Sequence, residues 1–327
     1  MTAQNENRTM YYGKGDVFVY RTFVQPLTGL RKIPESSFTE RDNTIFGFNC
    51  QISLKGEAFL SSFTEGDNSL VVATDSMKNI IHRQAANYQG NTAEGFLKFI
   101  CEVFLDKYSH IDAVELTATE VPFDHVLVPK GEGHENSDVV YRCSRNERAT
   151  TTIEVKRTPT GSKIVKHSSG IVDVHLIKVK GSSFYGFIQD EYTTLPEAQD
   201  RPLFIYLDFD WEYSRWEDGT GADPEKYVAA EQICDIANTV FHELNNRSIQ
   251  QLIYHIGIRI LERIPQLANV QFKTNNRTWE TVVETIPNSE GSVYQEPRPP
   301  FGFQGFVVTQ EDVKQKKAAD STVGASR

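Results

Sequence analysis

Lys14 is the first residue of this sequence whose type and setting could support chemistry. It stands within an aromatic and β-branched run from Met10 to Phe23. A lysine in such a strand is costly to bury unless it has a partner or a role, so it is either solvated at a sheet edge or used in proton transfer. Thr74 and Asp75 stand where a strand-like segment becomes helical. They are either a helix N-cap or neighbours of an anion bound at the helix start.

A second group of residues could bind a flat anion. Ile249 and Gln250 directly follow Ser248, a residue type that caps helices, so they also lie at a helix start. Phe184 offers an aromatic face and Arg201 a planar, charged fork. Both are also ordinary core and surface residue types. Together, however, they would suit an anionic heterocycle.

Several common catalytic motifs are missing from the sequence. The eight histidines never form HxH, HxxxH or HExxH, and the four cysteines never form CxxC. We therefore expect no cofactor and no protein-bound catalytic metal, and we interpret the cysteines as ordinary reduced thiols. Gly13-Lys14-Gly15 is not a phosphate loop, because the earlier Walker glycine is missing. No GxSxG motif supports nucleophilic hydrolysis.

Hydrophobic periodicity predicts the elements that must position these residues in the first half of the chain. The segments with strand-like composition are Met10–Phe23, Thr44–Asp75, Ala113–Val128 and Ser137–Arg157. Two helical patterns lie between the second and third of them. One is capped by Asp75 or Ser76, and the other by Asn91 with Glu94 in a capping box. The predicted order is ββααββ.

The second half of the chain repeats this order. Its strand-like segments are Gly170–Gln189, Pro202–Tyr213, Asn269–Val283 and Val293–Val308. Its helices are opened by Asp223-Pro224 and by Ser248 with Gln251, and Pro265 stops the second helix. The sequence thus predicts an α+β fold of two tandem ββααββ domains, with helices on one face of antiparallel sheets. The predicted bounds are a 1–9 tail, domains at 10–158 and 159–312, and a disordered 313–327 tail.

Composition limits the partners of the chain. It has 44 acidic and 34 basic residues and a formal net charge of -10, so it offers no broad basic surface to nucleic acid or anionic lipid. No apolar stretch approaches the roughly 20 residues that span a bilayer, and MTAQNENRTM has no apolar signal region. We expect no nucleic-acid or membrane partner and a cytoplasmic protein.

Six ordered stretches support a family resemblance. They are YGKGDV around Lys14, NSLVVATDSMKN around Thr74, SSFYGFIQDEYTTL around Phe184, Asp200-Arg201, SIQ at Gln250 and EPRPPFGFQGF near the C-terminus. In these stretches, which are spread along the chain from Tyr12 to Phe306, the sequence resembles urate oxidase (uricase), specifically the bacillus-type bacterial members of the tunnelling-fold family.

The resemblance implies a tunnelling fold (T-fold), in which each ββααββ unit supplies a four-stranded sheet and subunits of a homotetramer form a β-barrel tunnel. It implies cofactor-free oxidation of urate by dioxygen and water to 5-hydroxyisourate and hydrogen peroxide in urate degradation. It also implies catalytic roles for Lys14 and Thr74. Implied substrate-binding residues are Thr74 and Asp75 of one subunit and, on its neighbour, Phe184, Leu195, Arg201, Ile249, Gln250 and Asn276.

One string departs from the family pattern. The family's Asn-Lys-His, whose histidine completes a lysine-threonine-histidine relay, is here Asn276-Arg277-Thr278. Aligning Asn276 with the family asparagine makes Thr278 the third catalytic residue, whereas a one-residue shift would select Arg277. Two alternatives remain open: a pterin-acting T-fold enzyme, whose usual metal ligands are missing here, and a non-catalytic purine-binding protein that kept the pocket.

Overall fold

The structure is a computed structural model that describes residues 9–277, 280–295 and 298–324. The chain divides into two compact units. The first unit comprises residues 1–31, 39–169 and 215–227, and the second comprises 32–38, 170–214 and 228–327. This division falls inside one long strand, β7 (Gly161–Lys178). The bounds 10–158 and 159–312 remain a prediction for the folding domains.

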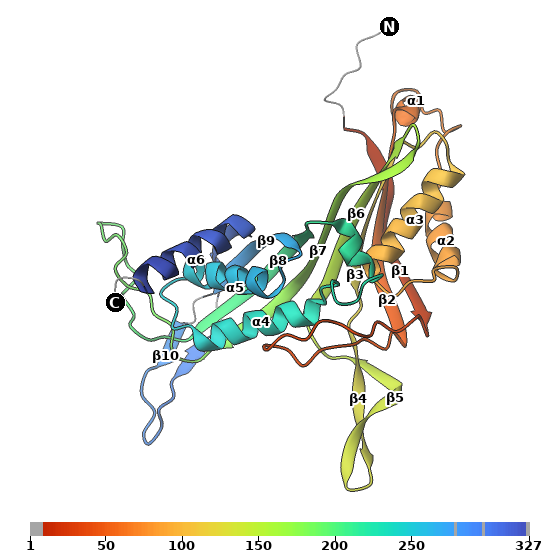
Figure 1. Ribbon diagram of the computed structural model, residues 1–327. Helices are drawn as coiled ribbons and strands as arrows, with labels where there is room; N and C mark the ends of the chain where they lie inside the picture. The colour runs from red at the N-terminus through yellow and green to blue at the C-terminus, as the bar shows by residue number, and fades with distance from the viewer. Residues whose placement is uncertain (1–8, 278–279, 296–297, 325–327) are drawn as a thin grey trace. The chain divides into compact units, whose positions relative to one another are not determined.

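The first unit has the predicted ββααββ order. Four of its strands are β1 (Tyr11–Thr22), β2 (Ile45–Lys55), β3 (Ala113–Glu120) and β6 (Arg148–Thr158), which pair antiparallel in the order β1-β2-β3-β6. Its longer helices are α2 (Thr74–Ala85) and α3 (Ala93–Lys107), which lie along one face of these strands (Figure 1). Alternate residues of β2 and β3, such as Ile52 and Leu116, are fully buried in the resulting core.

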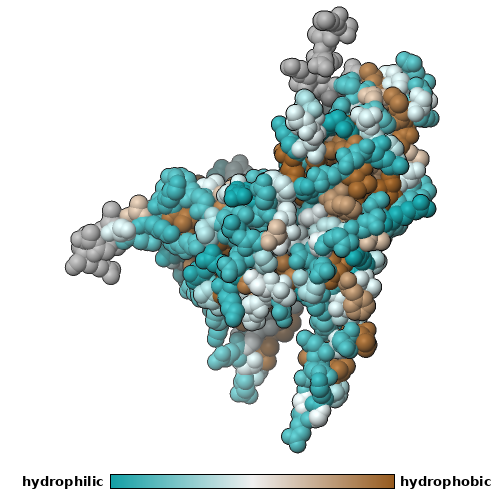
Figure 2. All heavy atoms as spheres, turned by 45° about the vertical axis from the view of Figure 1, so that its right-hand side comes forward, coloured by the Kyte–Doolittle hydropathy of each residue, from teal (hydrophilic) through white to brown (hydrophobic). Residues whose placement is uncertain are grey.

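Three parts of the first unit differ from the prediction, and in one of them the expected strand Ser137–Arg157 is wrong because residues 144–147 separate two different strands there. The expected strand Ala113–Val128 is wrong, because β3 ends at Glu120 and β4 (Phe123–Lys130) pairs instead with β5 (Gly133–Cys143) in a separate hairpin. Pro122 lies at the break, where its missing N–H prevents a continuous ladder. Figure 2 shows apolar patches along this hairpin. The segment after β2 is also not a strand but the short helices η1 (Glu57–Phe59) and α1 (Leu60–Thr64).

The second unit repeats the order around the later part of β7. Its other main strands are β8 (Leu203–Tyr213), β9 (Leu267–Arg277) and β12 (Gly302–Thr309), and these follow β7 in the order β7-β8-β9-β12. Its helices α4 (Ala230–Glu243) and α5 (Ile249–Arg263) precede β9 in the chain. A separate pair, β10 (Glu280–Val283) and β11 (Val293–Gln295), interrupts the predicted last two strands. The α+β class and the tandem repeat are confirmed.

Three helix starts differ from the predicted caps. α2 begins at Thr74 after the N-cap Ala73, so Asp75 lies in the first turn instead of capping the helix. α3 is capped by Thr92, whose side chain accepts a hydrogen bond from the N–H of Gly95, one residue later than predicted. α4 begins at Ala230 and not at Asp223-Pro224, which lie in the 215–227 segment of the first unit.

The C-terminal segment 313–327 was expected to be disordered, and most of it is instead helical. Helix α6 spans Gln310–Gly324. Its start is fixed by Asp312, whose carboxylate accepts hydrogen bonds from the N–H and hydroxyl of Thr309, each at 2.8 Å. Val313 is only 5% exposed, so packing compensates for the polar composition of the helix. Among the described helices, none has the length and apolar character that a membrane crossing requires.

Candidate active site

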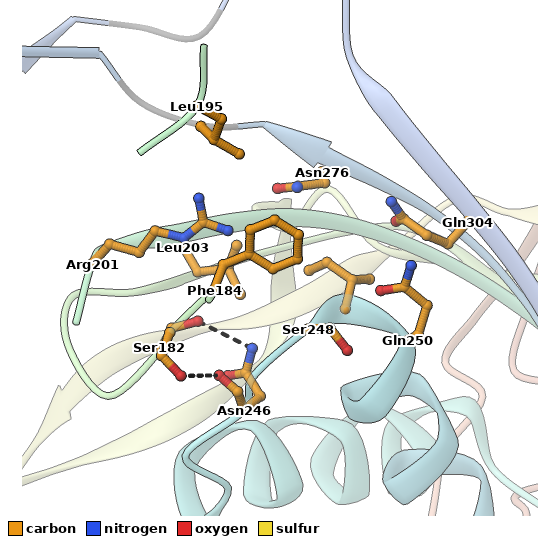
Figure 3. A pocket seen from close by; sticks show the side chains of 12 residues that line it. Ser182, Phe184, Leu195, Arg201, Leu203, Asn246, Ser248, Gln250, Asn276 and Gln304 are labelled. Atoms are coloured by element: carbon orange, nitrogen blue, oxygen red, sulfur yellow. Dashed lines mark hydrogen bonds between the residues drawn. The ribbon is translucent and has the colours of Figure 1, made fainter. Parts of the chain in front are cut away.

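A pocket in the second unit brings together six of the residues singled out from the sequence (Figure 3). The cavity measures about 120 Å³ and lies among the β7–β8 loop, the start of α5 and the ends of β9 and β12. Its lining residues are Ser182, Ser183, Phe184, Leu195, Arg201, Leu203, Asn246, Ser248, Ile249, Gln250, Asn276 and Gln304. A cavity of this size with an aromatic ring and several polar groups suits a small planar ligand.

Backbone hydrogen bonds hold the β7–β8 loop against the turn before α5. The N–H of Ser183 donates to the carbonyl of Asn246 at 2.9 Å, and the Asn246 side-chain amide donates to the Ser182 hydroxyl at 3.0 Å. The N–H of Arg201 donates to the carbonyl of Ser182 at 2.8 Å. Asn246 is 1% exposed. These bonds fix both ends of the loop that carries Phe184 and Arg201.

The polar groups of the pocket favour an anionic ligand. The guanidinium carbon of Arg201 lies 5.3 Å from the centroid of the Phe184 ring, and burial lowers the pKa of this guanidinium. The Arg201 Nε and the Asn276 Oδ1 are both buried and have no hydrogen-bond partner within the described part of the chain. A buried donor or acceptor without a partner is costly, so both atoms are available to a ligand.

The start of α5 adds a positive electrostatic field at the pocket, which favours an anionic ligand. Ser248 caps the helix by accepting a hydrogen bond from the Gln251 N–H at 3.1 Å, as predicted. The Gln251 side chain accepts from the Arg247 N–H at 2.8 Å instead of from Ser248, so the predicted capping box is only half formed. Ile249 and Gln250 follow the cap and line the cavity. The positive end of the helix dipole therefore lies beside the ligand space.

Gln304 is a pocket residue that motifs and residue spacing did not predict, although it lies in the EPRPPFGFQGF stretch. It is directly opposite Thr274 in the pairing of β12 with β9. The buried Thr274 hydroxyl donates to the Gln304 Oε1 at 2.7 Å, so the Gln304 side-chain NH₂ is left to face the pocket (Figure 3). Only the register of the two strands reveals this pair. The lining residues Ser182, Ser183, Leu203 and Asn246 were also not predicted, because nothing in their residue types or spacing marks them.

Lys14, Thr74 and Asp75 belong to the first unit, where β1 packs against α2. The pKa of Asp75 is lowered, first by its hydrogen bond and charge pairing with Lys78, then by Asn79, and Lys14 also contributes attraction. Lys14 is therefore close enough to the start of α2 to act on the charge of Asp75.

The backbone around Lys14 is unusual for a strand. The pairing of β1 with β2 shifts register between Lys14 and Val17, which is a β-bulge. A Cβ added at Gly13 would lie 1.8 Å from the carbonyl oxygen of Ile52, so only glycine fits there. The bulge and the close approach at Gly13 set the direction of the lysine side chain.

The third member of the implied relay is not located. Thr278 lies outside the described residues. The alternative, Arg277, holds its guanidinium carbon 3.6 Å from the centroid of the Tyr206 ring and 4.5 Å from that of Phe301. Its Nε also donates to the Asn275 Oδ1 at 3.3 Å. Arg277 thus packs on aromatic rings and is not among the described residues that line the cavity.

No group of three or more His, Cys, Asp or Glu side chains in residues 9–277, 280–295 and 298–324 could hold a metal ion.

The fold and the pocket define a tandem α+β protein with a site for a small, flat, anionic ligand at a helix start. Residues 10–153 and 167–304 match the family model described as Uricase. The chain therefore belongs to the uricase family.

Relatives and solved structures agree with this assignment. The chain is 54% identical over 310 residues to the uric acid degradation bifunctional protein PucL of Bacillus subtilis (strain 168), covering 95% of this chain and 63% of that protein. It is 51% identical over 309 residues to a uricase of Haloferax volcanii, covering 94% and 100%. The crystal structure of a uricase from Bacillus fastidious aligns with a TM-score of 0.93 at 61% identity, covering 95% and 97%. The chain thus spans about 63% of the length of its bifunctional relative.

Proposed function

We propose that this chain is a urate oxidase, which converts urate, dioxygen and water to 5-hydroxyisourate and hydrogen peroxide without a cofactor. The observation that carries the proposal is the cavity that the Phe184 ring lines together with the Arg201 Nε and the Asn276 Oδ1, two buried atoms with no hydrogen-bond partner among the described residues. Urate is flat, anionic and rich in hydrogen-bonding groups, so it complements such a cavity.

The binding roles follow from the chemistry of each side chain. Phe184 stacks on the purine, while Arg201 and Gln250 hold opposite edges of the ring, and Leu195 and Ile249 provide apolar contacts. Bound as a dianion, urate is electron-rich enough to donate electrons directly to dioxygen, which becomes hydrogen peroxide. Asn276 faces the dioxygen. Water then adds to the oxidised purine and gives 5-hydroxyisourate.

The proton-transfer roles fall to the first unit. Lys14 and Thr74 relay the protons that leave urate and water, with Thr278 as the third relay group, and Asp75 contributes to binding. Lys14→Met should lower kcat by ~10² to 10⁴ while substrate binding changes far less. Thr278→Ala should lower kcat less than Lys14→Met, because a hydroxyl passes a proton along but does not store one near neutral pH. An equal loss in both variants would contradict the assigned order.

We further propose that the active form is a homotetramer whose sites combine Lys14, Thr74 and Asp75 of one chain with the pocket of its neighbour. Mixing an inactive Thr74→Ala chain with an inactive Arg201→Ala chain should then restore activity after co-refolding. Random pairing would make roughly a quarter of the sites intact. No recovered activity would contradict a site shared between chains.

The decisive test is an assay for loss of urate absorbance together with peroxide formation. Stoichiometric peroxide with urate loss is expected. Binding of urate without turnover would select the non-catalytic purine-binding alternative. We also propose a cytoplasmic location, which the four cysteine thiols support because thiols persist in a reducing compartment.

A further inference from the structure

A second aromatic ring stacks on the Phe184 ring. The Phe184 and Phe187 rings are nearly parallel, with their centroids 4.8 Å apart and an interplanar angle of 14°. Phe184 lines the cavity, whereas Phe187 is not among the described residues that line it. We infer that Phe187 is a positioning residue that holds the Phe184 ring at the orientation needed to stack on the substrate. This assignment rests on the proposed function and deepens it.

The loop between these residues is built to fold Phe187 back. Gly186 has a φ of 74°, in the left-handed region that glycine adopts without strain. Its N–H donates to the Glu197 carboxylate at 2.8 Å. Phe184 and Ala198 exchange two backbone hydrogen bonds, at 2.8 and 2.9 Å. These hydrogen bonds hold the turn at Phe184 and at Gly186. The chain therefore reverses direction, and the Phe187 ring stacks on the Phe184 ring.

The side chains near Phe187 in the sequence lie in different surroundings. Tyr185 pairs with Arg247, whose guanidinium carbon lies 5.2 Å from the tyrosine ring centroid. Ile188, on the other side of Phe187, is 86% exposed. Of these consecutive apolar side chains, Phe187 is the one paired with the Phe184 ring.

The stack has a consequence for ligand binding. A Phe ring at a cavity wall has rotational freedom that must be lost when a flat ligand stacks on it. The parallel partner removes this freedom before binding, and offset stacking between two rings is itself favourable. Loss of ring 187 should therefore weaken binding by about tenfold without changing the groups that transfer protons.

The experiment compares three variants of the full-length chain. Phe187→Leu keeps an apolar side chain but removes the ring, Phe187→Tyr keeps the ring, and Ile188→Ala is the control at the exposed neighbouring position. Urate binding is titrated under strictly anaerobic conditions, so that no turnover occurs, and kcat and KM are measured in air. Thermal unfolding of each variant reports on folding.

The expected result is a dissociation constant and a KM about ten times higher for Phe187→Leu, with kcat at saturation within about twofold of the unmodified chain. Phe187→Tyr and Ile188→Ala should behave like the unmodified chain. Unchanged binding in Phe187→Leu, or equal losses in the Leu and Tyr variants, would overturn the assignment while leaving the proposed function intact. An unmodified chain that binds no urate would overturn both.

Discussion

Tyr12 connects the strand that carries Lys14 to the segment that leads into α2. Its hydroxyl accepts a hydrogen bond from the Val72 N–H at 2.7 Å and donates to the Val72 carbonyl at 3.3 Å. Its ring packs edge-on against Phe59, with centroids 4.8 Å apart. Thr74 follows two residues after Val72. Removal of the hydroxyl by Tyr12→Phe should therefore loosen the arrangement of Lys14 and Thr74.

The magnitude of the stability loss follows from these contacts. Val72 is 6% exposed, so its N–H would be left largely without a partner. A buried donor without a partner costs about 1–3 kcal/mol, which is the expected loss in the free energy of unfolding. A displacement of about 1 Å at a relay group can cost 10²-fold in rate, and we expect a loss in kcat of roughly tenfold, since β1 and α2 remain packed.

The assay measures kcat, KM and chemical denaturation for Tyr12→Phe beside Tyr11→Phe. Tyr11 is 59% exposed and adjacent in sequence, so its variant removes a hydroxyl from the same strand without disturbing Val72. KM should stay within about twofold in both variants, because Arg201 and Gln250, the residues proposed to hold the two edges of urate, lie in the second unit. Full kcat in Tyr12→Phe, or an equal fall in kcat in the two variants, would show that the Tyr12 hydroxyl does not position Lys14 and Thr74.

Three further predictions concern stability and cofactors. In urea denaturation, Glu35→Gln should lower the free energy of unfolding by about 1.5–3 kcal/mol. The reason is that the Glu35 side chain is 3% exposed and accepts charged hydrogen bonds from Arg263 and Arg259. An unchanged denaturation midpoint would contradict this prediction. Burial raises the pKa of Glu94, with Ser169 partly opposing it, so the folded state holds this proton more tightly than the unfolded chain. The stabilising effect of that proton is complete below the ordinary value of 4.5 and is lost as pH rises. Glu94→Gln should therefore raise the melting temperature at pH 8 and not at pH 4. A rise in melting temperature confined to low pH would contradict this prediction. Activity should survive exhaustive chelation, and loss reversed by one added metal would refute the cofactor-free reaction.

Elements with clear capping and helix-breaking residues at their ends were predictable from the sequence. α5 spans Ile249–Arg263, between the cap Ser248 and the stop Pro265, because both signals act through nearby backbone groups. The prediction of one strand over Ala113–Val128 was wrong, because strand pairing depends on distant partners and not on local signals. The β-propensity of this segment is real throughout, but propensity does not say which partner strand each part will pair with. α6 was missed because Val313 is held by tertiary packing and not by helix periodicity.

The candidate site was predictable to a different degree. The family resemblance supplied Phe184, Arg201 and Asn276, which line one pocket, whereas residue types alone left each with an ordinary explanation. Gln304 and Phe187 could not be found in this way. The orientation of Gln304 depends on its strand register with Thr274, and that of Phe187 on the turn at Gly186. Such features arise from chain geometry and carry no composition signal.

The two repeats use the same helix start for opposite purposes. In both units the second helix is capped by a hydroxyl, Thr92 in the first and Ser248 in the second, and two residues later comes Glu94 or Gln250. Glu94 is 8% exposed and accepts a hydrogen bond from Ser169, so the first unit uses this position for its own packing. Gln250 instead lines a cavity. A carboxylate at that position would repel an anion, whereas a neutral amide can both donate to and accept from a purine edge. A binding site must leave polar groups available to a ligand, which lowers stability, and in a duplicated fold one repeat can carry the site while the equivalent position of the other makes a contact within its own unit.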